Sequence, residues 1–459
     1  MKIIPIEYGS GHLKVAVPDQ TEIAGMKHSP APLTGAVAIP AALDNPLDSP
    51  SLSALAVQKL AENSLSKAVI VVSDHTRPVP YRGENGLIPN ILRALIRGGF
   101  KETAITVLIG AGSHRNMEPD EIEKMLGLKE SGFSKVSVVN HEYDVPEQLT
   151  YLGKTRMGSV VMINRLYMGA ELKIVTGLVE SHFMAGASGG RKGVCPGIVG
   201  KETLNIFHGA RFLSSAQAAD MILDGNPLHD EALEIAQMAG CDFLVNVTID
   251  NEKRITGVFA GNLQTAHQAA VQKIRSYVMV PLPHLYDIVV IPAGFVGVNH
   301  YQAAKAAIEA ARAVKPGGQM VLVARHTDPD PIGGAGYKEA IRLLHATGRQ
   351  NFTSMILTPG WKLIQEQWQV QMWCKVFEIL GKEENLLYCA LEIPEKEYEY
   401  LPGTPCVSML SAAEKANSKT SMRIMIEKAI EYACLKSGKN SPSILLLKDG
   451  PYGIPEVVS

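Results

Sequence analysis

Short apolar runs alternate with amphipathic segments along most of the chain. Runs rich in Val and Ile, such as 68–72 and 243–249, are typical of strands buried in a sheet. Segments in which apolar residues recur every three or four positions, such as 87–96 and 228–238, predict helices. This alternation favours an α/β fold with mainly parallel sheets flanked by helices. The same patterns predict further strands at 104–109, 136–139, 172–175, 255–259, 287–292, 320–323, 386–392 and 444–447, and further helices at 52–60, 120–126, 264–278, 301–314, 336–346, 362–380 and 411–436.

The chain is too long for one hydrophobic core, so two domains are expected. An alternating hairpin, 2–8 with 13–17, opens the chain. Pro281-Leu-Pro283 marks a boundary after which the α/β rhythm restarts, and Lys315-Pro-Gly-Gly318 predicts a turn. We expect an N-terminal α/β domain over 1–263, to which 437–459 return, a linking helix over 264–284, a smaller C-terminal α/β domain over 285–405 and a second linking helix over 406–436.

The composition is that of an ordinary globular protein, with 46% hydrophobic and 20% charged residues. The formal net charge of -2 gives no reason to expect nucleic acid or an anionic membrane as a partner. No apolar run reaches the ~18 residues that a membrane span needs, and Pro5 and Glu7 interrupt the start too early for a secretory signal. The six cysteines form no CxxC pair and no zinc spacing. We therefore expect a cytoplasmic protein with reduced thiols.

Polar residues follow three of the expected strands at the point where each strand ends. Asp74 and Arg77 follow the strand 68–72, His114 follows the next strand, and a glycine-rich segment that includes Lys192 follows the third. Ligands of parallel α/β sheets bind beyond the carboxyl ends of the strands, so these residues are expected at one edge. An arginine there is suited to holding an anionic substrate oxygen. An exposed turn with an internal ion pair is the alternative for the first of these segments.

The glycine-rich segment, 186–193, is typical of a loop shaped around a bound ligand, because glycine allows positive φ and a close backbone approach. It is not a P-loop, since Arg191 stands where that motif needs glycine and Gly193 stands where it needs Ser or Thr. A turn-rich loop without a ligand is the alternative, because such loops are common and most lysines are solvated.

His114 and His182 both lie on loops at expected strand ends. A single histidine of this kind is more often structural, but two at one sheet edge make acid–base chemistry credible, because imidazole titrates near neutral pH. His208 is a weak metal ligand by itself, since metal sites usually have three or four protein ligands. Any metal here needs ligands from outside the chain. His229 and His267 belong to no motif.

The predicted second domain contributes a polar helix start. Gln302 and Lys305 lie three positions apart, and therefore on one helix face, next to Tyr301. At a helix N-terminus these side chains favour a carboxylate, and a solvated helix end is the alternative. Trp368 is most simply a packing residue.

Together these motifs resemble the nickel-dependent lactate racemase family of 2-hydroxyacid racemases and epimerases. Any one of these motifs would be a weak signal, but so many of them in the same order as in the family are specific for it. The resemblance rests on Asp74-His-Thr-Arg77-Pro, Gly112-Ser-His114-Arg115, Ser181-His182, Ala185-Gly-Ala-Ser-Gly-Gly-Arg-Lys192, Pro196-Gly197, His208, Tyr301-Gln302-x-x-Lys305 and Gln367-Trp368.

The resemblance implies a two-domain α/β architecture with the active site in the interdomain cleft. It also implies a nickel-pincer nucleotide, pyridinium-3-thioamide-5-thiocarboxylic acid mononucleotide, and cofactor-biosynthesis proteins as partners. Lys192 would form the covalent tether to this cofactor, and Gly189 and Gly190 would shape its loop. His208 would be the single protein ligand of nickel, because the pincer supplies the other ligands. Within the glycine-rich loop, Ala187 and Arg191 depart from the pattern of this family.

The resemblance assigns catalytic and substrate-binding roles to both predicted domains. His114 and His182 would be the alternating acid and base, and Arg77, with Asp74 nearby, would contact the reacting part of the substrate. The remaining substrate contacts would come from Tyr301, Gln302 and Lys305, which hold the carboxylate, and from Trp368, which lines the pocket.

The implied reaction inverts C2 of a 2-hydroxyacid. Its C2–H is a poor acid, so removal of hydride while a histidine takes the hydroxyl proton avoids a carbanion and gives a planar 2-oxoacid. The substrate would be lactate-like or a larger polar 2-hydroxyacid, such as malate or an aldonate, if His300 and the polar segment 325–330 reach its tail. The alternatives are a non-catalytic storage protein for the pincer cofactor and a 2-hydroxyacid dehydrogenase or hydro-lyase. No GxGxxG opens a βαβ unit, which argues against the dehydrogenase.

Overall fold

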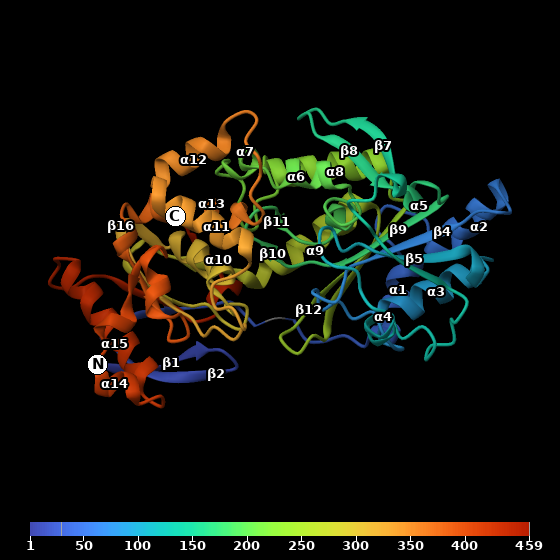
Figure 1. The fold of residues 1–459 in the computed structure, drawn as a ribbon. Coiled ribbons are helices and arrows are strands. Elements are labelled where there is room, and N and C mark those ends of the chain that lie inside the picture. Colours follow the sequence, from blue (N-terminus) through green and yellow to red (C-terminus); the bar gives the residue numbers. More distant parts are fainter. Residues whose placement is uncertain (29, 459) are drawn as a thin grey trace. The chain divides into compact units, whose positions relative to one another are not determined.

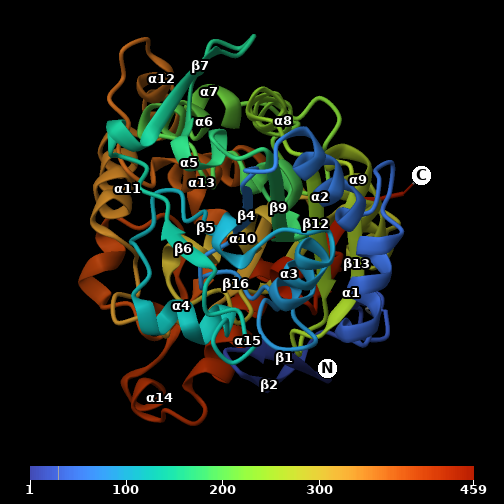
Figure 2. The same ribbon diagram turned by 90° about the vertical axis from the view of Figure 1, so that its right-hand side faces the viewer.

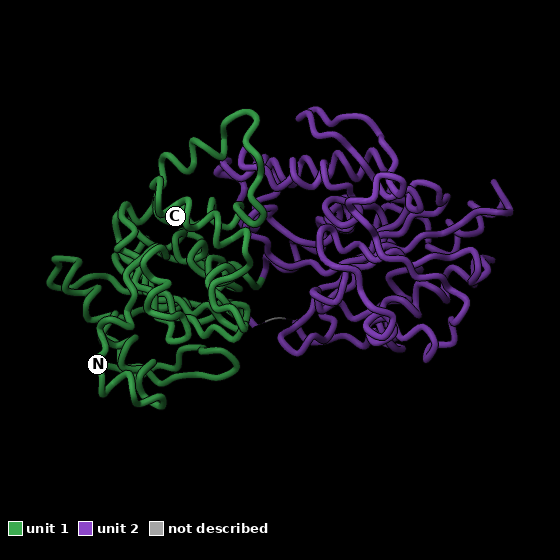
Figure 3. The backbone as a smooth tube through the Cα atoms, viewed as in Figure 1, with its two compact units in different colours: residues 1–27, 277–459 green, residues 28–276 purple. Residues whose placement is uncertain are grey.

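The computed structural model describes residues 1–28 and 30–458 (Figure 1 and Figure 2). The chain forms two compact units (Figure 3). The middle unit contains residues 28–276, and the terminal unit contains residues 1–27 together with 277–459. No helix among the described residues has the length and apolar character that crossing a membrane requires.

A six-stranded sheet forms the centre of the middle unit. Its strands are β4 (Ala68–Val72), β5 (Ile105–Ile109), β6 (Ser137–Asn140), β9 (Leu172–Leu178), β12 (Phe243–Ile249) and β13 (Ile255–Gly261). They follow the order β13-β12-β9-β4-β5-β6, and all neighbours are parallel except β12 and β13. Every residue of β4 is buried, as is typical of a central parallel strand.

The helices of the middle unit begin where the sequence supplies capping groups. Its helices are α1 (Gly35–Asp44), α2 (Leu52–Glu62), α3 (Leu87–Arg97), α4 (Pro119–Leu126), α5 (Arg165–Met168), α6 (Lys201–Phe207), α7 (Ala210–Leu213), α8 (Pro227–Ala239) and α9 (Leu263–Val278). The Ser51 hydroxyl accepts from the backbone N–H of Ala54 at the start of α2, and the Asn226 side chain caps α8. Apolar residues of α1, α2 and α3 share one core with the sheet.

The terminal unit has a second six-stranded sheet. The unit also has two smaller sheets, one formed by β1 and β2 and the other by β14 and β20. The strands of these three sheets are β1 (Lys2–Tyr8), β2 (Gly11–Val17), β3 (Glu22–Ala24), β14 (Met279–Leu282), β15 (Tyr286–Pro292), β16 (Val314–Val323), β17 (Leu386–Cys389), β18 (Thr404–Pro405), β19 (Ile444–Leu447) and β20 (Ile454–Val457). The sheet is parallel throughout, in the order β18-β17-β16-β15-β19-β3. The predicted hairpin forms from β1 and β2.

Six helices complete the part of the terminal unit that the structure describes. They are α10 (His300–Ala311), α11 (Ala335–Thr347), α12 (Arg349–Leu357), α13 (Gln367–Leu380), α14 (Ala412–Ala416) and α15 (Ser421–Lys436). Buried residues of α15 and of the β1–β2 hairpin share one core with the sheet. The predicted α/β class, with mainly parallel sheets flanked by helices, is confirmed.

The division of the chain differs from the predicted boundaries. Residues 437–459 do not return to the domain predicted over 1–263, because β19 pairs with β15 and β3 inside the terminal unit. The β1–β2 hairpin also belongs to the terminal unit. The second predicted linking helix, 406–436, lies inside the terminal unit, whereas the chain does pass between the units at residues 276 and 277, within α9 and within the predicted linking helix 264–284. An apolar run shows that a strand is buried, but not with which strand it pairs.

Two local predictions also differ from the structure. The helix predicted over 411–436 is broken between α14 and α15, where the Ser421 hydroxyl donates to the Asn417 carbonyl at 2.6 Å. Short polar side chains in this segment bond the backbone and compete with a continuous helix. The turn predicted at 315–318 is an irregularity inside β16, where the pairing with β15 shifts register.

Candidate active site

Asp74 and His114 form a hydrogen-bonded pair beyond the carboxyl ends of β4 and β5. The Nδ1 of His114 lies 2.7 Å from the Oδ2 of Asp74, and the Thr76 hydroxyl donates to the Oδ1 of Asp74 at 2.6 Å. Only 4% of the Asp74 side chain is exposed, against 55% of the His114 side chain, so a buried carboxylate orients an accessible imidazole. Burial alone would raise the pKa of Asp74, but the hydrogen bonds from His114 and Thr76 outweigh burial and leave this pKa below its ordinary value.

The loop that carries His114 is bonded to the loop that follows Lys192. The backbone N–H of Gly112 donates to the Gly197 carbonyl at 3.0 Å. A Cβ at Gly112 would lie 3.3 Å from the Pro196 carbonyl oxygen, and the φ of +57° at this position favours glycine. The expectation that strand-end loops meet at one edge of the sheet is confirmed for these two loops.

His182 contacts Lys192 directly. It lies in β10 (Ser181–His182), which forms a short hairpin with β11 (Gly186–Ala187). The Nε2 of His182 is 3.2 Å from the Nζ of Lys192. The Nδ1 of His182 accepts hydrogen bonds from the backbone N–H groups of Met184 and Ala185, each at 3.2 Å. One predicted acid–base residue is therefore joined to the predicted tether.

Gly189 and Gly190 are required by the packing of the loop. Their φ values are +70° and +53°. A Cβ at Gly189 would lie 2.7 Å from the Val179 side chain, and a Cβ at Gly190 would lie 2.6 Å from the His267 ring. Both glycines thus have a structural reason in the protein itself, and their contact with a cofactor stays a prediction.

Electrostatics favour neutral forms of Lys192 and His208. Burial, followed by the charges of Arg191 and Arg77, lowers the pKa of Lys192 to about 7. Burial, followed by the charge of Lys192, lowers the pKa of His208 to about 3. The Nζ of Lys192 lies 5.9 Å from the ring centroid of Phe207, the residue before His208. A histidine with this pKa is neutral at pH 7, which is the form that binds a metal.

A site made of protein ligands alone is not found around His208. Within the part of the chain that the structure describes, no group of three or more His, Cys, Asp or Glu side chains is arranged to hold a metal ion. A metal on His208 would therefore depend on ligands from another molecule.

Arg77 lies exposed on the loop after β4. Its backbone N–H donates to the Asp74 carbonyl at 3.2 Å, but the Asp74 carboxylate bonds His114 and Thr76. The internal ion pair considered for this turn is therefore not formed. The positive charge of Arg77 acts on Lys192, whose pKa it lowers.

Asn246 supports the site although no motif marks it out. Its side-chain oxygen accepts from the backbone N–H of Gly190 at 2.9 Å, and its amide nitrogen donates to the Gly177 carbonyl at 3.3 Å. The residue is buried within β12, a strand of mainly apolar residues. A lone amide in a mainly apolar strand needs hydrogen-bond partners, and this is the signal that could have identified Asn246 from the sequence.

In the terminal unit, Tyr301 and Trp368 are joined. The indole N–H of Trp368 donates to the Tyr301 hydroxyl at 3.1 Å, and the Gln369 side chain donates to the Tyr301 carbonyl at 2.7 Å. Gln302 and Lys305 lie on α10 with Tyr301. Four of the predicted substrate contacts lie in this unit, and the structure joins two of them through a hydrogen bond and the other two through their shared helix.

The backbone at the start of α10 offers no free donors to a carboxylate. The first N–H groups, those of His300 and Tyr301, donate to the carbonyls of Pro331 and Ile332 at 2.8 and 2.9 Å. The third, that of Gln302, donates to the capping side chain of Asn299 at 2.8 Å. Any carboxylate at this helix end must therefore be held by side chains, and not by the helix N-terminus that we had expected to help.

Two histidines that we expected near the substrate tail are buried instead. The Nδ1 of His300 lies 2.7 Å from the Tyr337 hydroxyl, and its ring stacks on Trp373 with 5.0 Å between centroids. The Nδ1 and Nε2 of His326 lie 2.9 Å from the Gly297 carbonyl and 3.0 Å from the Tyr388 hydroxyl. These side chains stabilise the core of the terminal unit.

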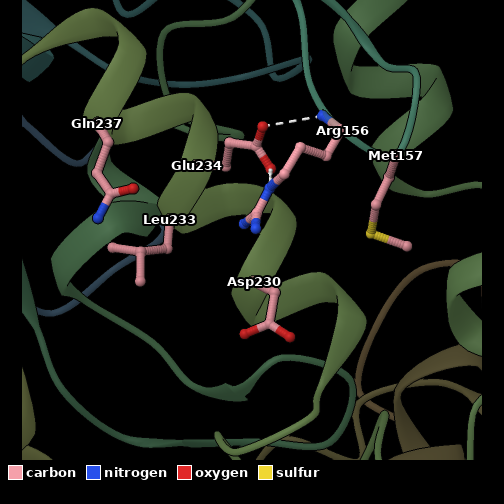
Figure 4. A pocket seen from close by; sticks show the side chains of 6 residues that line it. All are labelled: Arg156, Met157, Asp230, Leu233, Glu234 and Gln237. Atoms are coloured by element: carbon pink, nitrogen blue, oxygen red, sulfur yellow. Dashed lines mark hydrogen bonds and ion pairs between the residues drawn. The ribbon is translucent and has the colours of Figure 1, made fainter.

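Two surface hollows lie apart from the predicted catalytic residues. A cavity of about 370 Å³ in the middle unit is lined by residues of α8 and by Arg156, which forms an ion pair of 3.0 Å with Glu234 (Figure 4). The Arg156 side chain is 85% exposed, so this pair contributes little. A cavity of about 430 Å³ in the terminal unit is lined by Asn299, Asp328, Asp330 and Lys338.

The sequence of the chain is similar to a family model and to proteins of known function. Residues 8–220 match the family model of the lactate racemase N-terminal domain. The chain is 31% identical over 336 residues to the lactate racemase of Lactiplantibacillus plantarum, an alignment that covers 73% of this chain and 76% of that protein. The chain belongs to the lactate racemase family.

Further proteins are similar over most of the chain. The lactate racemase of Thermoanaerobacterium thermosaccharolyticum is 29% identical over 383 residues, covering 82% of this chain and 86% of that protein. The structure of the lactate racemase apoprotein from the same organism superposes with a TM-score of 0.80 at 25% identity, over 99% of this chain and 100% of that one. A crystal structure of a Thermotoga maritima protein, at 18% identity and a TM-score of 0.59 over 89% and 98% of the two chains, shares the fold. The predicted family, fold class and isomerase class are confirmed.

Proposed function

We propose that this protein is a racemase that inverts C2 of lactate and uses nickel held by a pincer nucleotide. The contact of 3.2 Å between His182 and Lys192 carries the proposal, because it joins an expected proton-exchanging residue to the expected site of cofactor attachment. The names of the relatives as lactate racemases support the same reaction.

The residues around Lys192 fit a tethered nickel cofactor. An amine whose pKa is about 7 is about half unprotonated at neutral pH, and only an unprotonated amine forms a covalent bond. The neutral His208 supplies one nitrogen ligand. The nucleotide would supply the remaining ligands, which is consistent with the described residues containing no larger ligand set. When bound, this group supplies the metal and the acceptor for the hydride of C2.

His114 and His182 exchange the hydroxyl proton of the substrate. One imidazole removes this proton from one enantiomer and the other imidazole removes it from the opposite enantiomer, so both directions are served. The buried carboxylate of Asp74 orients the ring of His114 through the hydrogen bond to its Nδ1. Arg77 holds an anionic oxygen of the substrate with its exposed guanidinium.

Tyr301, Gln302, Lys305 and Trp368 bind the substrate carboxylate and line its site. The hydrogen bond from Trp368 fixes the Tyr301 hydroxyl, which supports a defined position for this group. A larger substrate, such as malate or an aldonate, is less well supported than lactate. Its expected contacts included His300 and His326, and both are buried.

The proposal is tested with protein that has been loaded by the cofactor-making enzymes. Intact mass and metal analysis are expected to show a covalent adduct on Lys192 and one nickel per chain. Chiral chromatography is expected to show interconversion of L- and D-lactate, and slower turnover of malate and aldonates. Replacing His114 or His182 by Ala should cut racemisation by orders of magnitude and leave the adduct in place.

The same measurements separate the alternatives. A loaded protein that turns over no 2-hydroxyacid would be a storage protein for the cofactor. A protein that oxidises lactate only when free nicotinamide cofactor is added would be a dehydrogenase. Either result, obtained with confirmed loading, would overturn the proposed racemase.

A further inference from the structure

Arg191 is a buried cation beside Lys192 with an unusual set of partners. Only 1% of its surface is exposed. Its Nη2 donates to the Ala185 carbonyl at 2.7 Å, and its Nη1 lies 3.0 Å from the Nε2 of His267. Its Nε has no hydrogen-bond partner among the residues that the structure describes. Burying a cation without a carboxylate is costly, and such groups are concentrated at functional sites.

The ring of His267 lies against this arginine, and its Nε2 is also 2.9 Å from the Ser188 carbonyl oxygen, which can only accept a hydrogen bond. Burial, together with the charge of Arg191, lowers the pKa of His267 well below its ordinary value, so its ring is neutral at pH 7. The same ring packs against Gly190, where a Cβ would approach it to 2.6 Å. The position of the guanidinium is therefore fixed from one side by His267 and the glycine-rich loop.

On its other side, Arg191 holds the residue that fixes the ring of His182. The backbone C=O of Ala185 accepts from Arg191, and the backbone N–H of Ala185 donates to the Nδ1 of His182. The N–H of Met184 donates to the same nitrogen. The Ala187 N–H also bonds the Ala185 carbonyl, at 2.9 Å, but the bond from the charged guanidinium is the stronger one.

This arrangement selects one protonation form of the His182 ring. A nitrogen that accepts two N–H bonds carries no proton, so a neutral His182 carries its proton on Nε2, the atom that lies 3.2 Å from Lys192. The other tautomer would place an N–H against two N–H donors and lose both hydrogen bonds. An imidazole that takes and gives a proton at a defined atom needs this kind of constraint.

We propose that Arg191 is a positioning residue for His182, which holds Ala185 so that His182 keeps its exchangeable proton on Nε2. The role of His182 in proton exchange rests on the proposed function, but the tautomer is a property of the protein without its cofactor. From the sequence alone, Arg191 has no assigned role beyond excluding a P-loop and departing from the family's loop pattern, because its partners are a backbone carbonyl, that of Ala185, and His267, which belongs to no motif.

The tautomer is measured on the full-length apoprotein with histidine labelled by ¹⁵N in the ring. Long-range ¹H–¹⁵N spectra near neutral pH distinguish a protonated from an unprotonated nitrogen, and the His182→Gln variant identifies the signals of His182. The wild type is expected to show the proton on Nε2. Arg191→Met is expected to lower the ratio of the Nε2–H to the Nδ1–H tautomer about tenfold, which corresponds to about one net hydrogen bond. Arg191→Lys, which keeps a charged donor, is expected to lie between the two.

Arg165→Met is the matched control, because Arg165 is exposed and also donates to a backbone carbonyl, that of Leu149 at 3.3 Å. It is expected to leave the His182 signals unchanged. A wild-type His182 with its proton on Nδ1 would overturn the proposal, even if Arg191→Met failed to fold. An unchanged tautomer ratio in a folded Arg191→Met or Arg191→Lys protein would overturn it as well.

A failure of the proposed racemase activity would be seen in turnover measurements and not in the tautomer of His182. A loaded His182→Ala protein with wild-type turnover would remove His182 from the reaction and leave the Arg191 result standing. A tautomer that does not depend on Arg191 would remove the positioning role and leave the racemase standing.

Discussion

Replacing Asp74 by Asn tests the pair that orients His114. Asparagine fills nearly the same space and its oxygen still accepts from the Nδ1 of His114, but the negative charge is lost. The hydrogen bond of 2.7 Å that orients His114 would then no longer be made to a buried carboxylate. The expected effect is therefore on proton exchange and not on the loading of the cofactor.

The size of the effect follows from the geometry. A hydrogen bond to a charged group contributes about 1.5–3 kcal/mol. Because 55% of the His114 side chain is exposed, solvent screens part of this interaction, and the lower part of the range applies. About 1.4 kcal/mol corresponds to a factor of ten in rate, so kcat/KM is expected to fall about tenfold to thirtyfold.

The assay is racemisation of L- and D-lactate by loaded protein, followed by chiral chromatography. The two enantiomers have equal free energies, so kcat/KM must fall by the same factor in both directions. Asp44→Asn is the matched control, because it removes a carboxylate from an exposed ion pair with Arg97 and is expected to be nearly neutral. A fully loaded Asp74→Asn protein with wild-type kcat/KM would refute the role of the Asp74–His114 pair.

Four further predictions concern the loop, the metal ligand and pH. In the apoprotein, Lys192 should react with an amine reagent with a midpoint near pH 7, because its pKa is lowered to about 7 and the neutral amine predominates above that pH; peptide mapping over a pH series checks this. His208→Ala should keep the adduct mass but lose nickel, as intact mass and metal analysis would show. Gly190→Ala should lower the free energy of unfolding by about 1–3 kcal/mol in urea titrations, because its Cβ would lie 2.6 Å from His267 at a φ of +53°. The folded pKa of Asp74 is lowered, so its contribution to stability is fully present above its unfolded value of about 3.9 and is lost as pH falls through the folded pKa; urea titrations at several pH values should show this loss in the wild type and not in Asp74→Asn.

The strands were the most predictable elements of the fold. The predicted strands 68–72, 243–249 and 444–447 match β4, β12 and β19 at both ends, because buried parallel strands consist of short apolar runs. The helix α1 was missed because it contains Pro40, and proline usually ends a helix. The place of β19 in the terminal unit was wrong because pairing between distant strands leaves no local pattern in the sequence.

The site was predictable as far as it depends on strand ends. The pairs Asp74–His114 and His182–Lys192 come from loops that the alternation of strands and helices already placed at one edge. The support of these pairs was not predictable. His267 belongs to no motif, yet it contacts Arg191, because a buried side chain finds its hydrogen-bond partner in space and not along the chain.

Racemisation in D₂O tests the central claim most directly. Loaded protein would convert L-lactate to the racemate in D₂O, and NMR would report the hydrogen at C2. If His114 and His182 exchange only the hydroxyl proton, C2 should keep its original hydrogen through many turnovers, since hydride leaves and returns without meeting solvent. Deuterium that enters C2 as fast as the enantiomers interconvert would show that a base removes a proton from C2, and would contradict this account.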